Sequence, residues 1–355
     1  MNPERPGSGA SDADAVGTSD LAPSAANGEL RRHPKGGVVD FADALRSIGS
    51  VAAGHRTSHE SLALSRTHGR VLAEDVFEPG SETASDVGTT DELRDETVRG
   101  DPVLLAGRIL TPQRVSLAGS LGLGSLLVAR RPTVAVFIVG NGLVEPGMQL
   151  SPRQEHDGQR ELLMGLLRAD GLEPTGWPLL RDDARQVEIA LRDAGCAFDL
   201  IIVCESARTQ PNEKVAAVIE AFGELHFRGV RMQPGAATLF GSLDEARLLA
   251  MSGDAGSLQV AYLSLVRPLI DGLQGRTEAR ASWHARLSVA VDPDEAQCAF
   301  LHAHVSATRS GELVAQPILT AAREQSLVEA NALIRLPEQF RSLDAGTLVE
   351  VLGFA

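Results

Sequence analysis

Short apolar runs alternate with helical stretches between residues 133 and 274. The run at 134–139 is wholly apolar and ends at Gly140, which is typical of a buried strand that leads into a loop. The other elements expected here are strands near 176–179, 200–203, 225–230 and 248–251, and helices at 158–169, 184–194, 212–221 and 257–270. Such alternation predicts an α/β domain over residues 132–275, with a parallel or mixed sheet and flanking helices.

The two ends of the chain have different patterns. Residues 1–37 are rich in Gly, Ser, Ala, Pro and Asp and hold few large apolar side chains, so we expect a disordered tail. Residues 276–355 contain short strand-like segments, including 300–307 and 347–352, which are separated by prolines. This pattern predicts a small C-terminal β-barrel domain.

Residues 38–131 predict a reduced helical and linker region. Helical spacing of apolar residues is found at 41–48, behind an acidic cap, and at 62–76, where Gly69 interrupts it. An acidic linker is expected at 78–96. A short module follows at 102–131, with a helix that starts at the Thr111-Pro112 pair and a strand at 126–129.

Composition narrows the classes of function. The formal net charge of -14 and the pI near 5.1 argue against nucleic acid as a partner, because such proteins need clustered Lys and Arg. No apolar run is long enough for a membrane span, and no signal peptide is evident, so we expect a cytoplasmic protein that does not bind membranes. Cys196, Cys204 and Cys298 lie far apart without a metal-binding spacing, so they are interpreted as buried thiols.

Five segments resemble the molybdopterin molybdotransferase family, which comprises MoeA and the gephyrin E domain. They are LALSRTHGRVLAEDV from Leu62, RRPTVAVFIVGNGLVEPG from Arg130, GVRMQPGAATLFGSL from Gly229, MSGDAGSLQVAYLSLVRPLI from Met251, and SLVEANALIRLPEQFRSLDAGTLVEVL from Ser326. The resemblance implies the family's fold and elongated homodimer. It also implies a role in inserting molybdenum into adenylylated molybdopterin with the help of magnesium.

Several positions depart from the family's pattern at the loops around the ligand. The acidic TGDEL turn becomes Asn and Gly at 141–142, and the small-residue TSGG loop gains Glu205. Both lysines of MKPGKP are replaced, by Gln233 and Ala236, and the Asn of LPGNP becomes Asp254. These changes remove oxygen ligands for a hard cation and point charges for phosphates. They also add negative charge where the family's ligand is an anion.

A larger part of the family's pattern is missing between the first helices and the 102–131 module. The family has a PPFDNSAMDGYA stretch and a sizeable β-rich domain there, whereas this chain has residues 78–99 alone. The inserted domain is therefore interpreted as deleted, together with the site residues that it contributes.

The resemblance implies a set of surviving candidate site residues and no metal ligands. The best catalytic candidates are Asp157 and Asp254, and the candidates for cofactor binding are Arg160, Gly140, Pro234, Gly235, Ser252 and Gly253.

Ordinary structural roles compete with these assignments. Asp157 and Asp254 both precede helices and fit N-caps, and Arg160 fits either a phosphate contact or an ion pair with Glu155 or Asp157. Cys204 lacks a His–Asp partner pattern and is interpreted as a structural thiol. The pair His302 and His304 alternates on one strand, without a carboxylate at metal-binding spacing.

Two functions of different class follow from the resemblance. The first is a MoeA-like protein of molybdenum cofactor biosynthesis whose transferase site is degraded, with weak or no activity. The second is a non-catalytic paralogue that serves as a dimeric scaffold or regulator. Its partners would be a molybdenum cofactor biosynthesis protein or a molybdoenzyme. Magnesium and molybdopterin are implied by the family alone.

Overall fold

A computed structural model describes residues 36–78, 102–205, 212–292, 297–319, 327–338 and 342–354. Almost all of the predicted disordered tail and of the acidic linker lies outside these ranges, so both stay predictions. The boundaries placed between domains also stay predictions.

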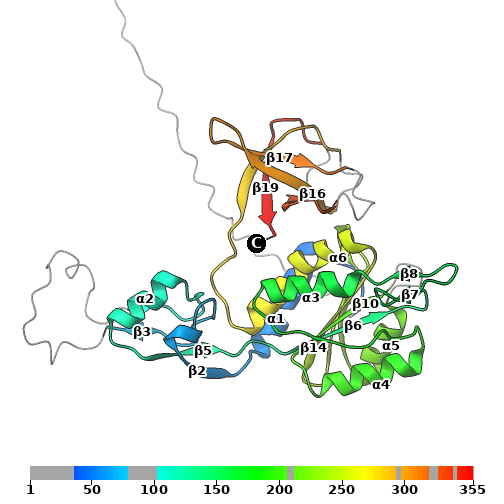
Figure 1. Ribbon diagram of the computed structural model, residues 1–355, viewed down its shortest axis with the longest axis horizontal. Coiled ribbons are helices and arrows are strands. Elements are labelled where there is room, and N and C mark those ends of the chain that lie inside the picture. Colours follow the sequence, from blue (N-terminus) through cyan, green and yellow to red (C-terminus); the bar gives the residue numbers. More distant parts are fainter. Residues whose placement is uncertain are drawn as a thin grey trace, which may run out of the picture. The chain divides into compact units, whose positions relative to one another are not determined.

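A six-stranded sheet forms the centre of the α/β part. Figure 1 shows its middle strands with helices on both sides. Its order is β11 (Gly223–Arg228), β13 (Leu239–Leu243), β14 (Ala246–Ser252), β10 (Leu200–Glu205), β6 (Val134–Val139) and β9 (Thr175–Gly176). β14, β10, β6 and β9 pair in parallel, while β13 and β11 are antiparallel additions at one side. The predicted mixed α/β sheet is therefore confirmed.

Alternate residues of the central strands pack into two different cores. Val136 of β6 faces a core shared with α1 (Phe41–Gly54), α3 (Gln159–Ala169), α6 (Ala255–Ala261) and α7 (Arg267–Leu273). Phe137 faces the opposite core, which is shared with α4 (Ala184–Gly195) and α5 (Glu213–Phe222). Because side chains of a strand alternate between faces, a continuous apolar run is what burial on both faces requires.

Two features of this sheet were not predicted. β12 (Val230–Gln233) leaves the sheet and pairs in parallel with β16 of the C-terminal part and with β1 (Val39–Asp40). The expected helix at 257–270 begins earlier, at Ala255, and contains a π-helical turn at Tyr262–Val266 before α7.

The part of the chain after α1 is built mainly from short strand pairs. β2 (His59–Ala63) pairs with β5 (Ser125–Ala129), and β3 (Val76–Phe77) pairs with β4 (Pro102–Leu104). α2 (Pro112–Ser120) begins where predicted, and the Thr111 side chain accepts a hydrogen bond from the Arg114 N–H.

The helix predicted at 62–76 does not form, so this prediction is wrong. Leu62 belongs to β2, a 3-10 turn follows at Leu64–Arg66, and Val71 and Leu72 form bridges with Ile109 and Val128. Pairing with distant strands overrides the helical spacing of the apolar residues.

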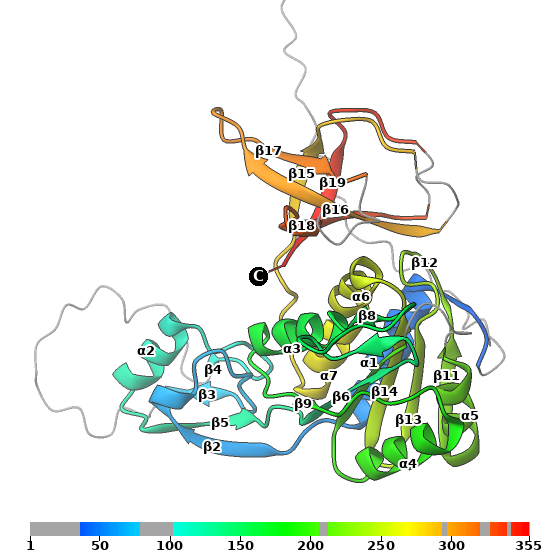
Figure 2. The same ribbon diagram turned by 45° about the vertical axis from the view of Figure 1, so that its right-hand side comes forward.

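The C-terminal part is a closed five-stranded barrel. β16 (Cys298–Ala307), β17 (Leu313–Pro317), β15 (Trp283–Leu287), β19 (Leu348–Gly353) and β18 (Ala332–Leu336) follow one another, and β18 returns to pair with β16. Figure 2 shows these strands curling around one another. The predicted β-barrel is confirmed, and closure leaves no free edge between its first and last strands.

Two smaller predictions are wrong. Cys196 is exposed at the end of α4, whereas Cys204 and Cys298 are buried as expected. Asp40 precedes α1, but its side chain makes no capping hydrogen bond and instead pairs with Arg231. Among the described residues, no helix is long and apolar enough to cross a membrane.

Candidate functional site

The carboxyl ends of three parallel strands meet at one edge of the sheet. Glu205 of β10 lies in register with Val139 of β6 on one side and with Ser252 of β14 on the other. The residues that follow these strands, Gly140 and Gly253, are therefore brought to the same edge. This is where open α/β sheets bind ligands.

Asp157 is buried at the start of α3, with 1% of its surface exposed. One carboxylate oxygen accepts hydrogen bonds from the backbone N–H groups of Gln159 at 3.0 Å and Arg160 at 3.2 Å. These contacts satisfy donors that a helix start leaves unpaired. Asp157 thus caps the first turn of α3 with its side chain, from the position before the N-cap residue Gly158.

Arg160 lies between two carboxylates. Its Nε is 3.5 Å from Asp157, one of its two predicted partners, and its Nη1 is 3.7 Å from Glu145. The Nε and Nη2 atoms are buried and make no hydrogen bond. The charge of Arg160 is thus compensated, although its hydrogen-bonding capacity is not used up.

Gln159 fills the space between two of the strand ends. Its amide nitrogen donates to the carbonyl of Gly253 at 2.9 Å, and the Cys204 thiol donates to its amide oxygen at 3.1 Å. Sequence reasoning did not single out Gln159. Its place in the first turn of α3, two residues after Asp157, was the only available signal.

Glu205 is a buried carboxyl group, with 3% of its surface exposed. Its Oε2 accepts the Asn212 backbone N–H at 2.7 Å, but its Oε1 has no hydrogen-bond partner. Burial is the main cause that raises the pKa of Glu205, and the nearby Asp182 raises it further, against the opposing effects of the Asn212 hydrogen bond and Lys214. The Glu205 carboxyl is therefore harder to ionise than an exposed glutamate.

Asn212 connects Glu205 to another loop of the candidate site. It adopts a left-handed backbone conformation with φ of 66°, and its side-chain amide donates to the carbonyl of Ala237. Ala237 follows the Pro234-Gly235 turn, in which Gly235 has φ of 100°, a backbone conformation that glycine adopts readily. The sequence predicted Asn212 only as the first residue of the helix at 212–221, and its linking role was not predicted.

The loop after β14 is an ordinary helix start. Gly253 has φ of 120°, and the Asp254 side chain accepts the Ser257 N–H at 2.8 Å as the N-cap of α6. The side chain of Ser252 lies outside the described structure. The predicted site residues are thus brought to one edge, where Asp157 and Asp254 make capping contacts.

The alternative nucleophile and metal candidates have structural surroundings. Burial, with added effects from Asp157 and Glu205, raises the pKa of the Cys204 thiol, which disfavours the reactive thiolate. His302 is buried and its Nε2 donates a hydrogen bond to the Gln259 amide oxygen at 3.2 Å, whereas His304 is exposed. Burial is the main cause that lowers the pKa of His302.

The residues present do not fit the family's magnesium ion. Within the described ranges, no group of three or more His, Cys, Asp or Glu side chains is arranged to hold a metal. Two acids near the strand ends are poorly suited as metal ligands. Asp182 already pairs with Lys214, and burial raises the pKa of Glu205, which disfavours its ionised form. A hard cation needs several free, ionised oxygen ligands.

Comparisons with known proteins agree with the fold. Residues 135–272 match the family described as "Probable molybdopterin binding domain", and residues 284–354 match "MoeA C-terminal region (domain IV)". Together these matches cover more than half of the 355 residues.

Curated relatives extend the same similarity. The molybdopterin molybdenumtransferase of Haemophilus influenzae is 27% identical over 74% of this chain and 66% of its own length. Molybdopterin molybdenumtransferase 2 of Mycobacterium tuberculosis is 26% identical over 72% of this chain and 65% of its own length. The chain therefore spans slightly less than two thirds of these relatives. A crystal structure of the MoeA protein of Pyrococcus horikoshii matches 90% of this chain and 99% of that one, with a TM-score of 0.69 and 22% identity.

The fold is thus that of a molybdopterin-binding α/β domain joined to a MoeA-type barrel. The chain belongs to the MoeA family, whose members take part in molybdenum cofactor biosynthesis.

Proposed function

We propose that this MoeA-family protein inserts molybdate into adenylylated molybdopterin weakly or not at all. The observation that carries the proposal is Glu205, a buried carboxyl group at the end of β10 with one unpartnered oxygen. The family's small-residue loop at this place allows backbone N–H groups to approach an anion. Glu205 repels an anionic ligand when ionised, and it occupies volume beside the strand end when protonated.

The other charges at the edge support the same proposal. Gln233 and Ala236 stand where the family has lysines, and Arg160 is compensated by Asp157 and Glu145. Stabilising a phosphate or an oxyanion requires uncompensated cations or free N–H donors. Gln159 further reduces the space available, because it bridges Cys204 and Gly253.

A non-catalytic role as a dimeric scaffold or regulator accommodates these features. The sheet, its two cores and the barrel are well formed, while the substitutions concentrate at the loops of one edge. Under this proposal the chain forms a homodimer and associates with a molybdenum cofactor biosynthesis protein or a molybdoenzyme. The partner would recognise the retained scaffold and not the chemistry of the site.

Titration of the purified protein with adenylylated molybdopterin tests the proposal. We expect binding to be weaker than that of the Haemophilus influenzae relative by about 100-fold or more, or roughly 2.7 kcal/mol. A Glu205→Gly variant should recover part of the affinity, whereas the matched charge change Glu188→Gln on α4 should not. Affinity equal to that of the relative, with turnover when molybdate and magnesium are added, would contradict the proposal.

A further inference from the structure

A cavity of about 540 Å³ lies away from the sheet edge described above. Its walls come from α1, α7, the segment after α7, and barrel strands β16, β18 and β19. Asp170, directly after the C-terminal end of α3, contacts Arg267 of the cavity wall. Asp157, at the sheet edge, precedes the N-terminal end of the same helix. α3 has 11 residues and is therefore about 16 Å long, so the cavity and the sheet edge lie near opposite ends of this helix.

One part of the cavity is apolar. Phe41 and Leu45 lie one helical turn apart on α1 and face Phe300 and Leu352 of the barrel. The rings of Phe41 and Phe300 meet edge to face, with centroids 5.4 Å apart. This volume and these walls are in the range that suits a small organic molecule.

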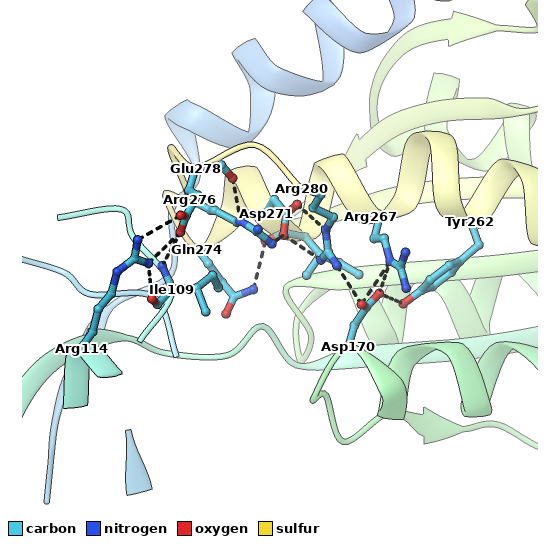
Figure 3. A network of polar contacts seen from close by, with 11 residues as sticks. Ile109, Arg114, Asp170, Tyr262, Arg267, Asp271, Gln274, Arg276, Glu278 and Arg280 are labelled. Atoms are coloured by element: carbon cyan, nitrogen blue, oxygen red, sulfur yellow. Dashed lines mark hydrogen bonds and ion pairs between the residues drawn. The ribbon is translucent and has the colours of Figure 1, made fainter. Parts of the chain in front are cut away.

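Five arginines and two acids line the cavity, although the whole chain carries a net charge of -14. Most of these arginines are already paired, as Figure 3 shows for those along α7. Arg267 donates to Asp170 at 2.9 Å, and Arg280 pairs with Asp170 at 3.0 Å and with Asp271 at 2.7 Å. These pairs hold part of the wall in place without leaving free charge.

Arg56 is the lining arginine for which the described part of the chain provides no partner. Its exposed side chain makes no hydrogen bond or ion pair within the described ranges, and it lies at the cavity beside Gly275. Arg276 also lines the cavity but is engaged, since its Nε donates to the Glu278 carbonyl at 2.8 Å and its Nη1 is 3.5 Å from Asp271. A guanidinium with all its donors free is suited to a carboxylate or a phosphate.

We infer that this cavity binds a small organic anion, whose apolar body lies against the half-buried Leu45 and Leu352 and whose carboxylate or phosphate contacts Arg56. The position of Arg56 supports this arrangement. Gly49 and Ala53 of α1 line the cavity, and Arg56, two residues after the end of α1, continues the same wall. The site does not depend on the activity at the sheet edge. It would give the chain a ligand even where the family's site is lost.

Two fluorescent probes of similar shape test the inference on the full chain. Anilinonaphthalene sulfonate carries one negative charge, and N-phenylnaphthylamine carries none. We expect one anionic probe to bind per chain, about tenfold more tightly than the neutral probe, because a single favourable charge contact is commonly worth a factor of this size. Phenyl phosphate or phenylacetate should displace the bound probe, and the stronger competitor identifies the preferred anionic group.

Four variants locate the binding. Arg56→Glu should weaken binding of the anionic probe by about tenfold or more, while Arg309→Glu, on an exposed barrel turn, should leave it unchanged. Gly49 lines the cavity, and a Cβ at this position meets nothing within 4 Å. Gly49→Leu should therefore fill part of the cavity without a clash and abolish binding of both probes. Gly165→Leu, at an equally open position on α3, is its matched control. Equal affinity for both probes, no effect of Arg56→Glu, or the absence of saturable binding would overturn the inference.

Discussion

Replacing Asp170 with Asn is expected to lower the free energy of unfolding by about 3–5 kcal/mol, the usual cost of removing one partner from a buried ion pair. Asp170 is 5% exposed and Arg267 is 8% exposed in their side chains, so water cannot compensate the arginine charge that remains. The Tyr262 hydroxyl also donates to Asp170, at 2.7 Å (Figure 3). Urea denaturation at neutral pH measures the change.

A half-buried pair, more accessible to water than Asp170 and Arg267, provides the control for Asp170. Arg335 and Glu350 are 3.3 Å apart, and each is about one third exposed, so Glu350→Gln should cost less than about 1 kcal/mol. If Asp170→Asn costs no more than Glu350→Gln, the network in Figure 3 does not stabilise the fold as its burial implies.

The Asp170 network also predicts a dependence on pH. Burial alone would raise the pKa of Asp170, but the Arg267 hydrogen bond and the charge of Arg280 lower it below the ordinary value of 3.8. A carboxyl whose pKa is lower in the folded chain stabilises the fold above the unfolded pKa, and this contribution is lost as pH falls through the folded pKa. The difference between wild type and Asp170→Asn should therefore narrow below about pH 4.

Replacing Glu205 with Gln is expected to stabilise the fold at pH 8, by roughly 1–3 kcal/mol. The neutral amide can still accept the Asn212 N–H, and it removes the cost of ionising a buried carboxyl whose second oxygen has no partner. Because the pKa of Glu205 is raised in the folded chain, this cost is absent below the unfolded pKa and grows as pH rises. The gain should therefore nearly vanish at pH 4.

Denaturation curves at pH 4 and pH 8 give the Glu205 measurement. Glu188→Gln, on the exposed surface of α4, is the control and should change stability little at either pH. A Glu205→Gln variant that is destabilised at pH 8 would mean that the ionised carboxylate has a stabilising contact. In that case a neighbouring group would compensate the charge of Glu205, and Glu205 would not repel an anionic ligand.

The sequence predicts an element correctly where its pattern of apolar residues fits only one kind of secondary structure. The apolar run of β6 must be buried on both faces, and its predicted bounds agree with the structure. The stretch at 62–76 was different, because its apolar spacing fits a helix as well as short strands. The pairing of β2 with β5 decides between them, and these strands lie far apart in the chain. β12 was missed for the same reason, since its partner β16 belongs to the barrel.

The candidate site could be located from the sequence more readily than its contacts. Parallel strands bring their carboxyl ends to one edge, so Gly140, Glu205 and Gly253 could be grouped before the structure was known. The bridging of Cys204 and Gly253 by Gln159 could not be predicted, because it depends on the side-chain conformation at the start of α3. The roles of the candidate site residues in binding or catalysis stay predictions.

Complementation tests the central claim most directly. The full chain is expressed in a bacterial strain that lacks its molybdopterin molybdenumtransferase, with the Haemophilus influenzae relative as the positive control. Because Glu205 is buried at the strand end and Arg160 is compensated, we expect the chain to restore no molybdoenzyme activity above background. Restoration approaching that of the control, at equal protein levels, would contradict the proposal that this site has lost its transferase chemistry.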